Sequence, residues 1–162
     1  MVYLQNSVCV LPDRPEQRKA LEELRGDIEE KRGEAQLMPI RLADAADEAR
    51  MKDLFRRQSE EEYAEVLGKC RDFHEELRRE RAAKHFTFAE LEENEEELSK
   101  IAAWRAKILK RDFFGAASAR KTSDAIDSCQ RDLDRYRLEV ADADGVGKRP
   151  ASAARKTRRK KS

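Results

Sequence analysis

The stretch Ser59–Leu77 reads SEEEYAEVLGKCRDFHEEL, and its apolar side chains recur every three or four residues. This spacing places them on one face of an α-helix, while charged side chains cover the other faces. Such a helix is only marginally stable alone, so the stretch predicts a helix that packs against other helices. The opening Ser59-Glu-Glu-Glu62 matches a capping box and predicts that the helix begins there. The apolar stripe consists of Tyr63, Val66, Leu67, Cys70, Phe73 and Leu77.

Two neighbouring segments repeat this helical pattern. A short helix is expected near 46–58, and a second capping box, Thr87-Phe-Ala-Glu90, predicts a helix that runs to Gly115. The apolar face of the short helix consists of Met51, Leu54 and Phe55. The apolar positions of the longer one are Leu91, Leu98, Ile101, Ala102, Ile108, Leu109 and Phe113.

A last helix follows, with Ser123 as its expected cap. Its apolar residues alternate in spacings of 3 and 4, which is a heptad seam. They are Ile126, Cys129, Leu133, Tyr136 and Val140. Because the breaks at 84–87 and 114–122 are short, neighbouring helices should be antiparallel. We therefore expect a long helical hairpin that resembles a coiled coil.

The beginning of the chain has a different pattern. The run 2–11, VYLQNSVCVL, predicts two short strands, or one strand bent at Gln5-Asn6-Ser7. Asp13-Arg-Pro-Glu16 is typical of a helix start, and Gly33 of a helix end. Glu34–Ile40 then predicts another strand, whose Pro39 suggests a sheet edge. The segment is expected to form a β-β-α-β unit.

Charge is distributed unevenly along the 162 residues. The chain has 35 Lys+Arg and 34 Asp+Glu, for a net charge of +1. Residues 145–162 hold eight basic side chains and no acidic ones, so the remainder carries about −7. From Asp142 onward Ala, Gly, Ser, Pro and basic residues predominate, which predicts a disordered basic tail over 142–162.

This tail is the candidate contact for nucleic acid. Cationic segments bind phosphate backbones through counterion release, without reading the base sequence. The alternative is a solubilising end with no specific partner. The candidate contact residues are Lys148, Arg149, Arg155, Lys156, Arg158, Arg159, Lys160 and Lys161.

The sequence offers little for catalysis or metal binding. Cys70 and His74 have the spacing of two metal ligands on one helix, but no third ligand accompanies them. We favour the alternative, in which Cys70 lies in the core and His74 at its rim. Acidic runs such as Glu92–Glu97 are typical of solvated helix faces, and no phosphate loop or nucleophile motif is visible. We therefore expect no catalytic, cofactor or metal site and no enzymatic activity.

Hydropathy and cysteine content indicate the expected cellular compartment. No apolar run approaches the ~18 residues of a membrane span, and the N-terminus lacks the features of a signal peptide. The three cysteines, Cys9, Cys70 and Cys129, are odd in number and far apart. They argue against a disulfide framework and for a reducing compartment. A cytoplasmic protein is expected.

Several motifs together resemble the N-terminal domain of ChrB proteins, bacterial regulators associated with chromate resistance. They are Tyr3-Leu-Gln-Asn-Ser-Val-Cys-Val-Leu-Pro-Asp13, a Leu-rich helix, Gly33-Glu-Ala35, a strand, and later Asp112-Phe-Phe-Gly115. The resemblance covers about 1–141. It implies a ferredoxin-like start followed by a long helical arm. It also implies a protein that represses a chromate-efflux operon and releases DNA when chromate is sensed.

The chain departs from this family pattern at both ends. A family member would begin with another strand and an Arg- and Trp-rich helix, whereas Met1 falls inside the equivalent of the second strand. The DNA-contacting arginines expected there cannot be carried over. The C-terminal chromate-related domain is replaced by the basic tail. Two explanations are open, a misplaced start site with coding sequence upstream or a stand-alone fragment, and we favour the first.

These observations predict an α+β chain that is mostly α. Its expected parts are a truncated ferredoxin-like segment (1–41), an antiparallel coiled-coil-like helical arm (42–141) and the disordered tail (142–162). The predicted function is regulation of chromate resistance through DNA binding, without catalysis. The alternative is a structural module whose helical hairpin docks a partner protein or self-associates. No cofactor and no membrane partner are expected.

Overall fold

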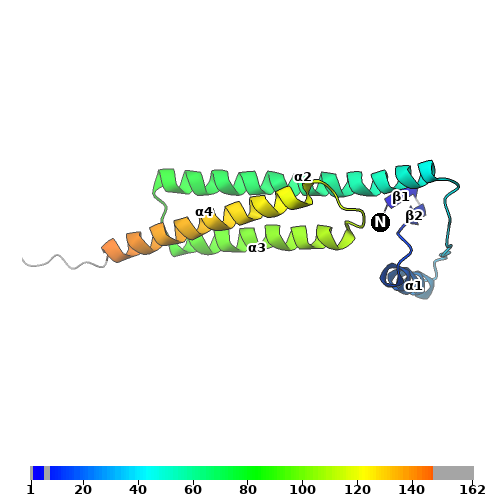
Figure 1. Ribbon diagram of the computed structural model, residues 1–162. Helices are drawn as coiled ribbons and strands as arrows, with labels where there is room; N and C mark the ends of the chain where they lie inside the picture. Colours follow the sequence, from blue (N-terminus) through cyan, green and yellow to red (C-terminus); the bar gives the residue numbers. More distant parts are fainter. Residues whose placement is uncertain (1, 6–7, 148–162) are drawn as a thin grey trace, which may run out of the picture. The chain divides into compact units, whose positions relative to one another are not determined.

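The computed structural model describes residues 2–5 and 8–147, and this part of the chain is mostly helical (Figure 1). Its elements in chain order are β1 (Val2–Gln5), β2 (Val8–Val10), α1 (Pro15–Glu30), α2 (Ala45–Ala83), α3 (Phe88–Arg111) and α4 (Ser118–Gly147). Among these helices, none has an apolar stretch long enough to cross a lipid bilayer.

Contacts divide the chain into two compact units. Unit 1 comprises Met1–Leu67 with Ala103–Ser123, and unit 2 comprises Gly68–Ala102 with Asp124–Ser162. The helices α2, α3 and α4 each contribute one segment to each unit. The units were not foreseen from sequence, because the helical pattern continues without interruption across all three boundaries between them.

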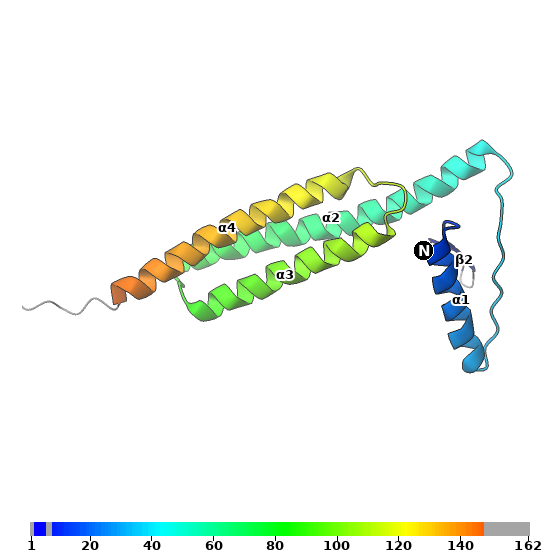
Figure 2. The same cartoon turned by 60° about the horizontal axis from the view of Figure 1, so that its bottom comes forward.

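Unit 2 is built from three helical segments that lie side by side (Figure 2). The apolar stripes predicted for α2, α3 and α4 supply its core, although Ala102 of the predicted α3 stripe is exposed, as is Leu109 in unit 1. The buried apolar residues are Cys70, Phe73, Leu77, Leu91, Leu98, Ile101, Cys129, Leu133, Tyr136 and Val140. The turn from α2 to α3 is tight: Lys84 has a φ of 56°, and the His85 N–H donates to the Glu80 carbonyl over 2.9 Å.

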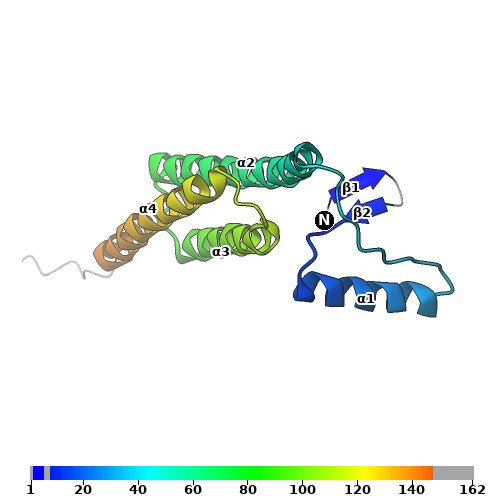
Figure 3. The same cartoon turned by 45° about the vertical axis from the view of Figure 1, so that its right-hand side comes forward.

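The helical part of unit 1 has its own core. It consists of Phe55, Tyr63, Val66, Leu67, Ile108, Ala116 and Thr122, of which all but the half-buried Leu67 are buried. The start of the unit is less well packed. The strands β1 and β2 form an antiparallel pair (Figure 3), and α1 contains no buried residue.

The predicted strand Glu34–Ile40 is wrong, because no regular structure forms there. The sheet of the described residues contains only β1 and β2. Pro39 has no N–H to donate to a neighbouring strand, and Met38 and Ile40 remain 69% and 63% exposed. The order is therefore β-β-α, and the ferredoxin-like β-β-α-β start is not found in the described part of the chain.

Two predicted helix starts are also wrong. The helix α2 begins at Ala45, where the Asp44 carboxylate accepts the Asp47 N–H over 2.8 Å, and it continues without a break through Ser59. Ser59 is buried within it, so its hydroxyl does not cap a new helix. The helix α4 begins at Ser118 rather than Ser123, because the carboxylate of Glu60 on α2 accepts the Ser118 N–H over 3.1 Å.

The helix start predicted at the second capping box is confirmed, with Thr87 as the cap. Thr87 Oγ1 accepts the Glu90 N–H over 3.2 Å, and α3 begins at the next residue, Phe88. At the other end of the chain, α4 continues to Gly147. Helix therefore covers the first six residues that were assigned to the disordered tail. The remainder of that predicted tail, 148–162, lies outside the described residues.

Candidate functional site

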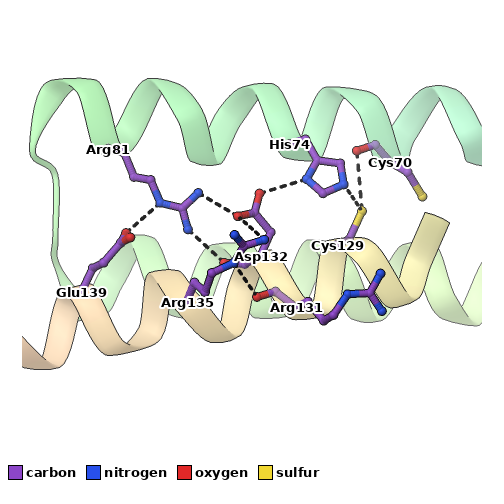
Figure 4. A network of polar contacts seen from close by, with 8 residues as sticks. All are labelled: Cys70, His74, Arg81, Cys129, Arg131, Asp132, Arg135 and Glu139. Carbon is purple, nitrogen blue, oxygen red and sulfur yellow. Dashed lines mark hydrogen bonds and ion pairs between the residues drawn. The ribbon is translucent and has the colours of Figure 1, made fainter. Parts of the chain in front are cut away.

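A network of polar side chains joins α2 and α4 in unit 2 (Figure 4). The centre of the network is Asp132 on α4. His74 Nδ1 lies 2.9 Å from one of its carboxylate oxygens, and Arg81 Nη1 donates to the other over 2.9 Å. Arg81 also donates to the Asp132 carbonyl over 3.0 Å and to the Glu139 carboxylate over 2.7 Å.

Helical spacing explains how this network forms. His74 and Arg81 are seven residues apart on α2, and so are Asp132 and Glu139 on α4. Seven residues are close to two helical turns, so each pair lies on one face of its helix. When these faces meet, His74 lies opposite Asp132, and Arg81 lies opposite Asp132 and Glu139. Charges of both helices are thus satisfied at the edge of an apolar core.

The network keeps Asp132 ionised although its side chain is only 15% exposed. Burial alone would raise the pKa of Asp132. Hydrogen bonds from His74 and Arg81, together with the positive charge of Arg81, outweigh burial and lower this pKa. Hydrogen bonds to Glu139 and Asp132, together with their negative charges, outweigh the burial of Arg81 and raise the pKa of its guanidinium. The ion pair is therefore stable in its charged form at neutral pH.

Two thiols continue the network along the helices. Cys129 Sγ lies 3.6 Å from the Cys70 carbonyl oxygen and 3.5 Å from His74 Nε2. If His74 donates its Nδ1 proton to Asp132, Nε2 faces the Cys129 thiol as an acceptor. A hydrogen bond from the Cys129 thiol lowers the pKa of Cys70, whereas that interaction and burial raise the pKa of Cys129.

The structure shows where both residues of the predicted Cys70/His74 pair lie. Cys70 is 2% exposed and lies in the core, and the side chain of His74 is 30% exposed at its rim, as the favoured interpretation predicted. Within the described residues, no group of three or more His, Cys, Asp and Glu side chains is arranged to hold a metal ion. Sequence reasoning missed Cys129 and Asp132 because they join the pair only through the packing of α4 on α2.

A shallow groove of about 450 Å³ lies between α2 and α3 in unit 2. It is lined mainly by carboxylates: Asp72, Glu76, Glu80, Glu90, Glu93, Glu96 and Glu97, with Lys69 and Lys100. Glu80 is only 6% exposed, and both of its carboxylate oxygens accept from Asn94 Nδ2, over 3.1 and 3.0 Å. Burial raises the pKa of Glu80 despite this hydrogen bond.

The Asp112-Phe-Phe-Gly115 motif forms the turn between α3 and α4 in unit 1. The Asp112 carboxylate accepts the Ala116 N–H over 2.9 and 3.0 Å, and Gly115 has a φ of 70°, which favours glycine. The Phe113 and Phe114 rings lie 6.1 and 5.4 Å from the Phe55 ring. This motif therefore closes the core of unit 1.

Two arginines hold the same turn from outside. Arg56 Nε donates to the Phe114 carbonyl and Arg14 Nη2 to the Phe113 carbonyl, each over 3.3 Å. The Arg14 guanidinium also lies 5.5 Å from the centre of the Phe113 ring, within the range of a cation–π contact. Arg14, which directly precedes α1, thus contacts the helical part of unit 1.

The eight predicted nucleic-acid contacts, Lys148 to Lys161, lie outside the described residues. Many arginines within the described part are engaged with carboxylates. Arg111 donates to Glu62 over 2.9 Å, and Arg137 donates to Glu95 over 2.8 Å. These guanidinium groups are partly neutralised by their partners.

Comparison with known proteins identifies the family. The family model described as "Protein ChrB, N-terminal" matches residues 1–145, which is nearly all of the described part of the chain. No curated protein and no solved structure matches the chain. The chain belongs to the ChrB N-terminal family, and the resemblance drawn from its sequence motifs is confirmed.

Proposed function

We propose that this member of the ChrB N-terminal family regulates chromate resistance by binding DNA, and that it does so without catalysis. Family membership relates the chain to chromate resistance. The observation that supports DNA binding is the concentration of eight basic side chains and no acidic ones in residues 145–162. Such a segment releases condensed counterions when it binds phosphates.

The remainder of the chain argues for the tail as the main contact. Its net charge of about −7 repels a polyanion at long range. Arginines such as Arg111 and Arg137 are already paired with carboxylates. Moving them to phosphates would leave Glu62 and Glu95 without these partners. The proposed complex therefore has the tail on the DNA backbone and the acidic helices directed away from it.

Fluorescence anisotropy on two duplexes tests the proposal. One duplex comes from the control region of the chromate-efflux operon, and the other is a scrambled sequence of the same composition. A regulator should bind the first more tightly. The variant Arg158→Gln/Arg159→Gln/Lys160→Gln/Lys161→Gln should lower the slope of log affinity against log salt by roughly 3–4, if each residue contacts one phosphate.

The matched control removes the same amount of charge from exposed positions on the helices. It carries Lys107→Gln, Lys110→Gln, Arg120→Gln and Lys121→Gln, all at exposed residues. This variant should leave the salt slope within about one of the parent value. Equal binding of both duplexes that disappears on deletion of 148–162 would reject sequence-specific regulation. Equal effects of the two quadruple variants would reject the tail as the contact.

A second candidate is a module that self-associates or docks a partner through its helical hairpin. The stripes that suggested it are buried within their own units and are not available for a partner. The favouring observation lies elsewhere in unit 2, where Phe88 and Leu138 are 62% and 67% exposed. Sedimentation velocity tests this candidate: a concentration-dependent dimer that Leu138→Glu abolishes would support it, and a monomer throughout the micromolar range would reject self-association.

A further inference from the structure

Cys70 and Cys129 are two buried thiols on facing helices of unit 2, and the DNA-binding proposal makes no use of them. They are 2% and 0% exposed. Cys129 Sγ lies 3.6 Å from the Cys70 carbonyl oxygen, so the thiol of α4 reaches the backbone of Cys70 on α2. Figure 4 shows each sulfur atom on the side of its helix that faces the other helix.

A histidine and a carboxylate, His74 and Asp132, lie beside these thiols. Cysteines that serve only for core packing have no such polar neighbours. His74 Nε2 is 3.5 Å from Cys129 Sγ, and His74 Nδ1 is 2.9 Å from the Asp132 carboxylate. A histidine oriented by a carboxylate can accept a thiol proton, and the carboxylate stabilises the resulting imidazolium. The His74 side chain is 30% exposed, so its ring lies at the rim of the core beside the buried thiols.

We propose that Cys70 and Cys129 form a redox-active dithiol, which a two-electron oxidant of the peroxide class converts to an intramolecular disulfide. In the first step the Cys70 thiolate attacks one peroxide oxygen. The O–O bond breaks, and Cys70 sulfenic acid and hydroxide form. The hydroxide takes up the proton that Cys70 has lost and leaves as water.

In the second step the Cys129 sulfur attacks the Cys70 sulfur, and the S–O bond breaks. The Cys129 proton passes to His74 Nε2 and then to the departing hydroxide, which leaves as a second water. The two thiols lose two electrons in total, and hydrogen peroxide gains two. The assignment of Cys70 as the attacking thiol agrees with its lowered pKa.

The experiment uses the full chain with Cys9→Ser, so that only this pair of thiols remains. The native protein is treated with hydrogen peroxide, and its mass should fall by about 2 Da as both thiols disappear. Non-reducing trypsin digestion should give Cys70-Arg71 linked to the peptide 122–131. The midpoint of thermal unfolding should rise by about 5–15 °C, because the bridge joins distant parts of the chain.

Two variants in the same background separate the steps. With Cys129→Ser, Cys70 should stop at the sulfenic acid, which dimedone traps. With His74→Gln, the disulfide should form roughly tenfold more slowly or worse while sulfenic acid accumulates. A purely structural role of His74 would not change this partition between the two products. Circular dichroism confirms that each variant remains helical.

A negative result with the Cys9→Ser protein alone would overturn the inference. Two results would do so: both thiols surviving peroxide that oxidises Cys9 in the unmodified chain, or separate sulfinic acids without a linked peptide. Disulfide formation that dithiothreitol reverses would support it. None of these outcomes depends on DNA binding by the tail.

Discussion

Asp132 and Glu80 are two carboxyl groups of unit 2 whose surroundings move their pKa values in opposite directions. Hydrogen bonds from His74 and Arg81 outweigh burial and lower the pKa of Asp132. Burial outweighs the hydrogen bond from Asn94 and raises the pKa of Glu80. The two groups therefore contribute to the free energy of unfolding with opposite dependence on pH.

Asp132→Asn should destabilise the protein at neutral pH. A folded-state pKa below the ordinary value means that ionised Asp132 stabilises the fold above that value, and that this contribution disappears as the pH falls through the folded-state pKa. We expect a loss of about 1.5–3 kcal/mol at pH 7, which shrinks in acid. Urea titrations at several pH values measure it.

The control for this prediction is Asp134→Asn, two residues further along α4. Asp134 pairs with Arg137 at 2.9 Å, but both side chains are about half exposed. Exposed pairs contribute about 0–1 kcal/mol. A loss as large as that of Asp132→Asn would show that the effect comes from the charge of α4 and not from the partly buried network.

Glu80→Gln should have the opposite effect. The raised pKa of Glu80 means that its neutral form is favoured in the folded state, so its contribution is present in acid and is lost as the pH rises through the folded-state pKa. A neutral amide that keeps an acceptor for Asn94 should raise the free energy of unfolding at pH 7, with less effect in acid. Glu93→Gln, at an exposed position in the same groove, should leave the pH dependence nearly unchanged. A stability loss for Glu80→Gln at pH 7 would contradict the prediction.

At the scale of single elements, the turn after α2 holds Lys84 with a φ of 56°. The His85 N–H bonds to the Glu80 carbonyl and the Lys84 N–H to the Arg81 carbonyl, the pattern of a Schellman cap. Glycine adopts this conformation without the strain of a side chain. Lys84→Gly should therefore stabilise the protein by about 1 kcal/mol, measured as a higher urea midpoint at an unchanged m-value.

Lys84→Ala provides the control for this turn. Alanine removes the charge and the long side chain but keeps the Cβ atom that makes a positive φ costly. It should not reproduce the gain from glycine. Equal gains from both substitutions would assign the effect to the lost charge and would reject backbone strain at this turn.

The elements that were predictable from sequence are those whose signals are local. The Thr87 capping box and the stripe from Cys70 to Leu77 depend on neighbours within one or two helical turns. The start of α4 was not predictable, because its first free N–H, that of Ser118, is satisfied by Glu60 of another helix. The break at Ser59 was wrong for a related reason: Asp44 caps the helix earlier, so Ser59 became an ordinary buried position.

The candidate site was also predictable only where its signals are local. The spacing of Cys70 and His74 was visible in the sequence, and so was the interpretation that places them at the core. The contacts of His74 with Asp132 and Cys129 depend on which face of α4 packs against α2, and no short-range signal fixes that choice. Likewise, the strand predicted at 34–40 had the right composition, but no neighbouring strand to pair with among the described residues.

At the scale of the whole molecule, the near-zero net charge is the sum of an acidic helical body and a basic C-terminal segment. In the described part, acidic side chains serve structural purposes: Asp132 and Glu62 hold arginines between helices, and Glu60 caps α4. The two charges are therefore expected to act separately, one on folding and the other on binding.

Deletion of 148–162 tests this separation directly. If the tail serves only for binding, the truncated chain should keep its helical circular dichroism, and its thermal midpoint should move by less than about 2 °C, because an exposed charged segment contributes little to stability. The comparison should be made at low and at high salt, since attraction between the tail and an acidic surface would be screened by added ions. A midpoint that falls on truncation at low salt only would show that the tail also binds its own body, and the carboxylate-lined groove of unit 2 offers a surface of opposite charge. That result would make DNA and the groove competitors for the same residues, and a duplex would then lower the midpoint of the full chain as truncation does.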